Sequence, residues 1–272
     1  MSGPLLTRKV HDVLSSAARS GVANVECSLD LDRTKVVVQV AADGWTVAGR
    51  RFPYLPRCKD RTIYYWTGAE FEPASRFTTS LIKLVPTQWG APTFEIDGIK
   101  MLPSARVSPY ADAEGKVRLI EPRGKRILDT CGGLGYFAAW CLQGGAAQIT
   151  SYEKSADVLW LRSLNPWSPS GAAELTLNHA DVASQIDALP PGSFGAALHD
   201  PPRFGIAGEL YSQRFYAALA RVLLPGAPLF HYTGSPNKLT SGRDVANEVS
   251  RRLRSAGFAS RLVGDGVLAH KR

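Results

Sequence analysis

The sequence predicts an α/β protein in which a sheet-and-helix domain follows a small β-rich domain. Three observations predict it. After residue 106, short apolar strands alternate with amphipathic helices, and several of these strands end in an acid. A glycine-rich turn at 131–135 follows the first of these strands, where a missing Cβ lets a ligand approach the backbone. Before residue 107, short β-like segments are separated by glycine and proline.

Residues 1–106 are predicted to form the β-rich domain behind a leading helix. Residues 4–20 carry apolar side chains near a 3.6-residue period, and Gly21 ends the pattern. The strands predicted here cover 29–31, 35–40, 45–47, 62–66 and 82–85. Asp43-Gly44 predicts a turn between two of them.

The segment 50–66 interleaves cations with aromatic residues. Arginine and lysine suit phosphates, and aromatic faces can stack on unpaired bases, so the segment is a candidate contact for RNA. The alternative is a solvated basic loop beside a strand whose aromatic side chains belong to the core. Both interpretations remain open at this stage.

Residues 107–272 are predicted to form the second domain, which a helix at 108–119 introduces. Its first strands are predicted at 126–128, 147–152, 175–179 and 194–199, and the acids that follow them are Asp129, Glu153, Asp181 and Asp200. Because the carboxyl ends of parallel strands meet at one edge of a sheet, we expect these acids at a common ligand site. Glu153 stands about 20 residues past the glycines, where an acid typically holds ribose hydroxyls.

The rest of the second domain continues the alternation. Helices are predicted at 136–143, 155–164, 209–224 and 244–256, and a fifth strand at 229–232. Asp265-Gly266 predicts a terminal hairpin between strands 260–263 and 267–270. Trp167, in the loop after the second of these helices, is either a stacking partner for an adenine ring or a buried structural residue.

The turn from Asp129 to Gly135, together with Glu153, Asp181 and Asp200-Pro201-Pro202, resembles class I S-adenosylmethionine-dependent methyltransferases. The runs 164–168, 199–204, 207–212 and 229–234 resemble a family of archaeal-type predicted methyltransferases, some of whose members are labelled spermidine-synthase-like. The resemblance implies a seven-stranded Rossmann-like sheet with helices on both faces. It also implies S-adenosyl-L-methionine as the cofactor.

The resemblance further implies roles for individual residues. The backbone of the glycine turn would pass beside the methionine portion, Asp129 near its ammonium, Glu153 at the ribose and Asp181 at the adenine amine. The cofactor-binding set is Asp129, Cys131, Gly132, Gly133, Gly135, Glu153, Asp181 and Asp200. Cys131 stands where the family usually has glycine, and a small packing residue is the alternative interpretation.

Asp200, Pro201 and Pro202 are the predicted catalytic residues. Prolines lack an N–H, so the loop offers only acceptors, and a carboxylate with a neighbouring carbonyl can accept both hydrogens of an amino group. In the resembling enzymes the next residue is usually aromatic, whereas here Arg203 precedes Phe204. The predicted substrate residues are Arg203, Phe204, Glu209, Tyr211 and His231. His199 and His231 end adjacent strands and can be proton relays, although a structural role is the favoured interpretation for each.

The resulting hypothesis is N-methylation of an amino group, with RNA as the first candidate acceptor. A small-molecule methyltransferase or an aminopropyltransferase is the alternative, and Arg203 argues against the latter because a cation repels a polyamine. A non-catalytic RNA-binding module is the third possibility, and the intact set of acids and glycines argues against it.

Composition adds weaker expectations. The net charge of +8 favours polyanionic partners, but it is spread over the chain, with 14 basic against 10 acidic residues before residue 107 and 18 against 14 after it. Four cysteines without Cys-x-x-Cys spacing predict neither a disulfide framework nor a metal site. No run is apolar enough for a membrane helix and the N-terminus has no signal core, so we expect a cytoplasmic protein without membrane contact.

Overall fold

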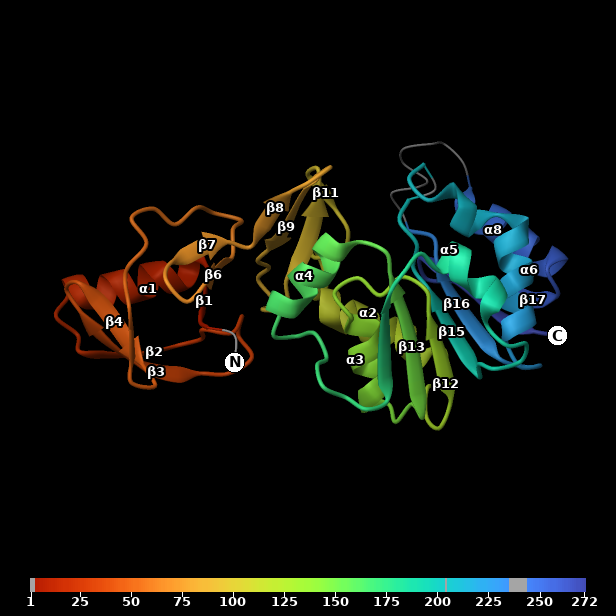
Figure 1. Ribbon diagram of the computed structural model, residues 1–272, viewed down its shortest axis with the longest axis horizontal. Helices are drawn as coiled ribbons and strands as arrows, with labels where there is room; N and C mark the ends of the chain where they lie inside the picture. Colours follow the sequence, from red (N-terminus) through yellow and green to blue (C-terminus); the bar gives the residue numbers. More distant parts are fainter. Residues whose placement is uncertain (1–2, 204, 235–243) are drawn as a thin grey trace. The chain divides into compact units, whose positions relative to one another are not determined.

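The computed structural model describes residues 3–203, 205–234 and 244–272 (Figure 1). The chain divides into two compact units. The first extends to Asp112 and also includes Trp160–Trp167, and the second comprises Ala113–Leu159 and Ser168–Arg272. The boundary therefore lies a little beyond the predicted position at 106, and the sequence did not predict that a short later segment belongs to the first unit.

The second unit is built on a seven-stranded sheet with the order β14-β13-β12-β15-β16-β18-β17. Its strands are β12 (Arg126–Asp129), β13 (Gln148–Glu153), β14 (Leu175–His179), β15 (Ala196–His199), β16 (Pro228–Tyr232), β17 (Phe258–Val263) and β18 (Gly266–Lys271). The strands from β12 to β16 pair in parallel, and β18 is antiparallel to both of its neighbours. The predicted α/β sheet with a terminal hairpin is therefore present.

Helices cover the two faces of this sheet, with α3 on one side and α6 and α8 on the other (Figure 1). After residue 107 the described part of the chain contains the helices α2 (Pro109–Arg118), α3 (Tyr136–Gln143), α4 (Ala156–Leu164), α5 (Val182–Gln185), α6 (Gln213–Val222) and α8 (Val245–Ser255), with 3-10 turns η1 (Ile186–Ala188) and η2 (Gly208–Tyr211). Buried apolar residues of α6 and α8, among them Leu219 and Leu253, join a core cluster with Leu229 and Phe258 of the sheet. This packing holds the strand ends in place.

The predicted helix over 209–224 is interrupted at Ser212. Residues 208–211 form the separate turn η2, and α6 begins afterwards. The reason is local: Ser212 has extended backbone, and its Oγ accepts a hydrogen bond from the N–H of Phe215 at 3.1 Å. A serine in this position satisfies one of the donors that a helix start leaves without an intrahelical partner.

The first unit contains three small antiparallel sheets and α1 (Arg8–Arg19). The sheets are β1 (Leu5–Leu6), β6 (Tyr64–Trp66) and β7 (Phe71–Pro73); β2 (Asn24–Cys27), β3 (Val36–Ala41), β4 (Gly44–Val47) and β5 (Arg50–Phe52); and β8 (Ser75–Phe77), β9 (Leu81–Val85), β10 (Thr93–Ile96) and β11 (Ile99–Lys100). Trp45 stacks on Phe52 at 4.7 Å between ring centroids, and both are buried in a cluster with Leu14 of α1. This core makes residues 3–112 a β-rich unit, as predicted.

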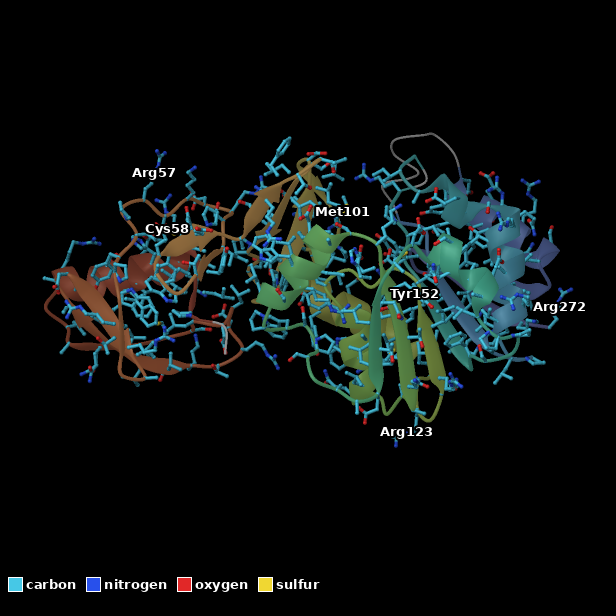
Figure 2. All side chains as sticks on the ribbon, in the orientation of Figure 1. Arg57, Cys58, Met101, Arg123, Tyr152 and Arg272 are labelled. Carbon is cyan, nitrogen blue, oxygen red and sulfur yellow. The ribbon has the colours of Figure 1, made fainter. Side chains whose placement is uncertain are left out.

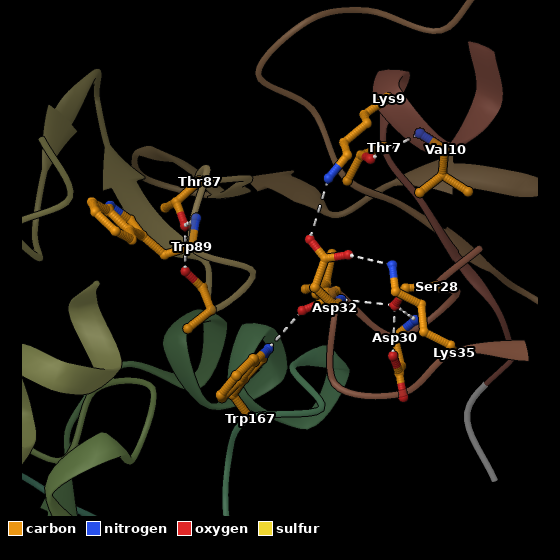
Figure 3. A network of polar contacts seen from close by, with 12 residues as sticks. Thr7, Lys9, Val10, Ser28, Asp30, Asp32, Lys35, Thr87, Trp89 and Trp167 are labelled. Atoms are coloured by element: carbon orange, nitrogen blue, oxygen red, sulfur yellow. Dashed lines mark hydrogen bonds and ion pairs between the residues drawn. The ribbon is translucent and has the colours of Figure 1, made fainter. Parts of the chain in front are cut away.

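The strand predicted at 29–31 is a tight loop instead. Leu31 and Asp32 have left-handed backbone, with φ of 57° and 63°. Ser28 Oγ accepts from the N–H of Asp32 at 2.8 Å (Figure 3). The Asp30 carboxylate accepts from the N–H and Oγ of Thr34 at 2.9 and 2.6 Å. These side-chain-to-backbone bonds favour a turn over a strand, and apolar periodicity does not detect them.

The segment Trp160–Trp167 packs within the first unit through its two tryptophans. Trp167 donates its indole N–H to the carbonyl of Leu31 at 2.9 Å (Figure 3). The guanidinium of Arg76 lies 3.7 Å from the ring centroid of Trp160, a cation–π contact. Trp167 thus has the structural role that the sequence left open as one of two interpretations.

We expect Trp167→Phe to lower the free energy of unfolding by about 1 kcal/mol, because the Leu31 carbonyl loses its indole donor in a partly buried place. Denaturant unfolding of the full chain measures it. Trp89→Phe is the matched control, since it removes an indole bond to the Ser104 carbonyl at a more exposed position. An equal loss of unfolding free energy in both variants would contradict the structural role assigned to the Trp167 indole bond.

Candidate functional site

The site begins with Asp129, the last residue of β12, which is only 1% exposed. Its neighbour in register on β13 is Ser151, whose hydroxyl donates to Asp129 Oδ2 at 2.8 Å. On the other side Asp129 pairs with Leu198, two residues before Asp200. Register and hydrogen bond together orient the Asp129 carboxylate at the carboxyl edge of the sheet.

The glycine turn follows directly and is tied to Glu153. Gly133 and Gly135 have φ of 48° and 82°, a region that side chains rarely adopt. The N–H of Gly133 donates to Glu153 Oε2 at 2.9 Å, and the N–H of Ser155 donates to Glu153 Oε1 at 2.9 Å. A Cβ placed on Gly133 would meet open space, so the backbone is accessible to a ligand there.

Cys131 lies in the glycine turn, close to several of the predicted acids in sequence and strand position. Burial raises the pKa of its thiol well above the ordinary value, and the charges of Glu153, Asp129 and Asp200 raise this pKa further. The three acids end or directly follow three neighbouring strands, β13, β12 and β15. The cysteine therefore stays a protonated thiol, and a common ligand site for the three acids stays a prediction.

Asp200 has a cationic neighbour that the sequence did not predict. Lys116 of α2 is 5% exposed, and its Nζ lies 4.0 Å from Asp200 Oδ2 and 3.7 Å from the ring centroid of Tyr232. Lys116 lies on the side of α2 that also carries the buried residues Ala113 and Val117. A lysine on the apolar side of a helix is unusual, and this signal could have identified Lys116 in the sequence.

Asp181 and Glu209 share a second lysine. Lys154 Nζ lies 3.7 Å from Asp181 Oδ2 and 3.9 Å from Glu209 Oε1. Asp181 Oδ1 also accepts from the N–H of Ala183 at 2.9 Å, which caps α5. Both acids thus lie close to Lys154, the residue that follows Glu153. The contact of Asp181 with adenine and that of Glu209 with the acceptor stay predictions.

The Asp-Pro-Pro loop is supported from behind by Tyr211. This side chain is 2% exposed, and its hydroxyl donates to the carbonyl of Pro202 at 3.1 Å. Tyr211 therefore positions the loop, which corrects its assignment as a residue that lines the acceptor. Arg203 is partly buried, and Phe204 lies outside the described residues.

The two strand-end histidines are buried completely. His199 Nδ1 lies 2.6 Å from Thr130 Oγ1 and its Nε2 3.0 Å from the Leu210 carbonyl. His231 Nε2 lies 3.0 Å from the Tyr216 hydroxyl and its Nδ1 2.9 Å from the Tyr232 carbonyl.

These partners fit two neutral imidazoles, each with one donor and one acceptor nitrogen. Burial lowers the pKa of His199 to about 4, and burial with the neighbouring His199 lowers the pKa of His231 well below its ordinary value. The assignment of His231 to the substrate is therefore corrected: it is a core residue.

The predicted RNA segment is divided between core and surface. Phe52 and Tyr64 are buried and cannot stack on a base, whereas Arg57 projects away from the ribbon (Figure 2). Arg51 pairs with Asp43, and Arg61 pairs with Glu95. Exposed cations such as Arg57 remain available at the surface, and their contact with RNA stays a prediction.

A cavity of about 430 Å³ lies within the first unit, lined among others by Arg8, Lys9, Asp32 and Asp60. Arg8 pairs with Asp60 at 3.0 Å and Lys9 with Asp32 at 3.7 Å. Arg61 also lines this cavity, and it pairs with Glu95.

Among the described ranges, no three His, Cys, Asp or Glu side chains form a group that could hold a metal ion. No helix in those same ranges combines the length and apolar character needed to cross a membrane.

Comparisons with known proteins identify the fold. A spermidine synthase in complex with the transition-state analogue AdoDATO superposes with a TM-score of 0.61 over 73% of each chain at 16% identity. Spermidine synthase from Thermotoga maritima gives 0.58 over 73% of this chain and 72% of that one at 17% identity. The protein therefore shares its fold with these spermidine synthases.

Sequence comparison identifies the family. Uncharacterized protein MJ1233 of Methanocaldococcus jannaschii is 40% identical over 202 residues, which cover 73% of this chain and 68% of that protein. The chain belongs to the family of this protein. Polyamine aminopropyltransferase of Mycobacterium tuberculosis is 31% identical over 144 residues, which are 50% of this chain but 27% of that enzyme. The scan against protein-family models finds no match.

Proposed function

We propose that this protein is an S-adenosyl-L-methionine-dependent transferase that methylates an amino nitrogen. One observation carries the proposal: Asp129 and Glu153 end the neighbouring parallel strands β12 and β13, and Glu153 accepts from the Gly133 N–H of the glycine turn at 2.9 Å. A nucleoside with a cationic sulfonium and an ammonium is complementary to such a pair of acids, because carboxylates attract both charges and accept from hydroxyls.

The residues present fit this cofactor. Open space above Gly133 admits a ligand against the backbone, and Ser151 holds Asp129 so that its carboxylate can accept from an ammonium. Glu153 lies where ribose hydroxyls are held in this fold. The cofactor, when bound, supplies an electrophilic methyl group on a positively charged sulfur.

The protonation of Cys131 matters for this chemistry. A thiolate is a strong nucleophile and would compete for an electrophilic methyl group. Burial and the three neighbouring carboxylates keep the sulfur protonated. The acidic cluster that attracts the cofactor thus also protects the cysteine from alkylation.

The acceptor side is the Asp200-Pro201-Pro202 loop. The prolines contribute no N–H, and Tyr211 holds the Pro202 carbonyl from the core. The Asp200 carboxylate and a loop carbonyl can then accept the hydrogens of an amino group and direct its lone pair toward the cofactor. The exposed cations of 50–66 make RNA the first acceptor to test.

Aminopropyl transfer is the second candidate. It is favoured by the two spermidine synthase structures and by the mycobacterial aminopropyltransferase. It is opposed by Lys116, because an ammonium 4.0 Å from Asp200 repels a polyamine that approaches the same carboxylate.

One experiment separates the candidates. The protein is incubated with methyl-labelled S-adenosylmethionine and total RNA, with the same cofactor and a small-metabolite pool, and with decarboxylated S-adenosylmethionine and putrescine. We expect label in RNase-sensitive material from the first reaction. A labelled small product that survives RNase would replace RNA by a metabolite, and spermidine from the third reaction would replace methyl transfer.

A further inference from the structure

Lys116 is a buried cation placed on the acceptor side of the site. Its ammonium lies 4.0 Å from Asp200 Oδ2, 3.7 Å from the Tyr232 ring centroid and 5.9 Å from the Phe137 ring centroid. Phe137 belongs to the helix that follows the glycine turn, and Tyr232 ends β16. The three partners therefore come from the loop, the helix and the sheet that frame the proposed site.

A carboxylate with aromatic faces around it is a typical binding site for an ammonium ion. The ring quadrupoles attract the cation, and the carboxylate supplies the opposite charge. In this protein the ammonium of Lys116 occupies that position. A side chain of the protein thus takes the place that an amine ligand would need beside Asp200.

We propose that Lys116 determines acceptor specificity by excluding polyammonium molecules from the Asp200 side of the site. The charge of Asp200 is already matched by Lys116, so a second ammonium meets repulsion instead of an unmatched carboxylate. The acceptor then has to present a neutral amino group, such as that of a nucleobase or an amide. This inference about Lys116 takes one element from the proposed function, namely that Asp200 binds the acceptor.

The test changes the charge of residue 116 while keeping its size. Lys116→Met and Lys116→Gln remove the charge, Lys116→Arg keeps it, and Lys125→Ala removes a lysine that donates to the Ile120 carbonyl. Putrescine is titrated into each protein by calorimetry at low ionic strength. We expect the neutral variants to bind putrescine at least about tenfold more tightly than the wild type, and the other two to behave like it.

S-adenosylmethionine is titrated into the same samples, so that the two proposals fail separately. If it binds and the neutral variants gain no putrescine affinity, the inference is wrong and the proposed function stands. If it does not bind and the neutral variants gain putrescine affinity, the inference stands and the proposed function is wrong. The inference is overturned if the wild type binds putrescine as tightly as Lys116→Met and Lys116→Gln do. Unfolding of both neutral variants by circular dichroism overturns it as well, because it would make Lys116 structural.

Discussion

Lowering the pH from 7.5 to 4 should reduce the free energy of unfolding by about 3 kcal/mol through His199 alone. Its pKa is about 4 in the folded protein because burial disfavours the charged imidazole, against about 6.5 in an unfolded chain. The unfolded state therefore binds more protons between these values. The contribution is present in full above pH 6.5 and is lost as the pH falls toward 4. His231 adds to the loss in the same direction.

Denaturant unfolding at pH 7.5, 6, 5 and 4 measures this effect. His199→Gln should flatten the dependence, since the replacement does not titrate. His270→Gln, at an exposed position, is the matched control and should keep the wild-type slope. If His199→Gln leaves the pH dependence of the unfolding free energy unchanged, His199 has the same pKa in the folded and unfolded states. The buried, neutral state described for it would then be wrong.

Replacing Glu153 with alanine should weaken binding of S-adenosylmethionine by about 2 kcal/mol or more, roughly thirtyfold. The variant loses a carboxylate that would accept from the ribose. It also loses the bond from the Gly133 N–H, which holds the glycine turn, and the bond from Ser155. Glu153→Gln keeps an acceptor of the same shape and should lose less, so the pair separates charge from geometry.

Calorimetric titration gives the affinity, and thermal unfolding shows whether the variant still folds. Glu174→Ala is the control, because this exposed acid precedes β14 at the opposite edge of the same sheet. Its affinity should equal that of the wild type. Unchanged affinity in Glu153→Ala would remove this residue from the cofactor site.

The strands and their acids could be read from the sequence because both signals are local. A buried strand is a short apolar run, and Asp129 or Glu153 is simply the residue that ends it. Parallel pairing then brings such residues to one edge. The parallel pairing is present, since Asp129 of β12 and Ser151 of β13 are partners in register.

The direction of a side chain was not readable in the same way. Tyr211 and His231 stand near the acids in sequence and strand position, yet both are directed into the core, where Pro202 and Tyr216 bind them. Lys116 shows the reverse case, because a lysine on a helix is normally solvated. Its contact with Asp200 joins residues 84 positions apart in the chain and exists only in the folded protein.

The amino-acid sequence by itself determined the order of strands and helices, the glycine turn and the acids that close each strand, because backbone propensity and apolar periodicity act over a few neighbouring residues. Tertiary structure alone decided which of the predicted site residues, such as Tyr211 and His231, are buried in the core. It also placed Trp160 and Trp167 in the N-terminal unit and Lys116 against Asp200. Those contacts join residues far apart in the chain, and burial, charge and hydrogen bonding select them only once the backbone has folded.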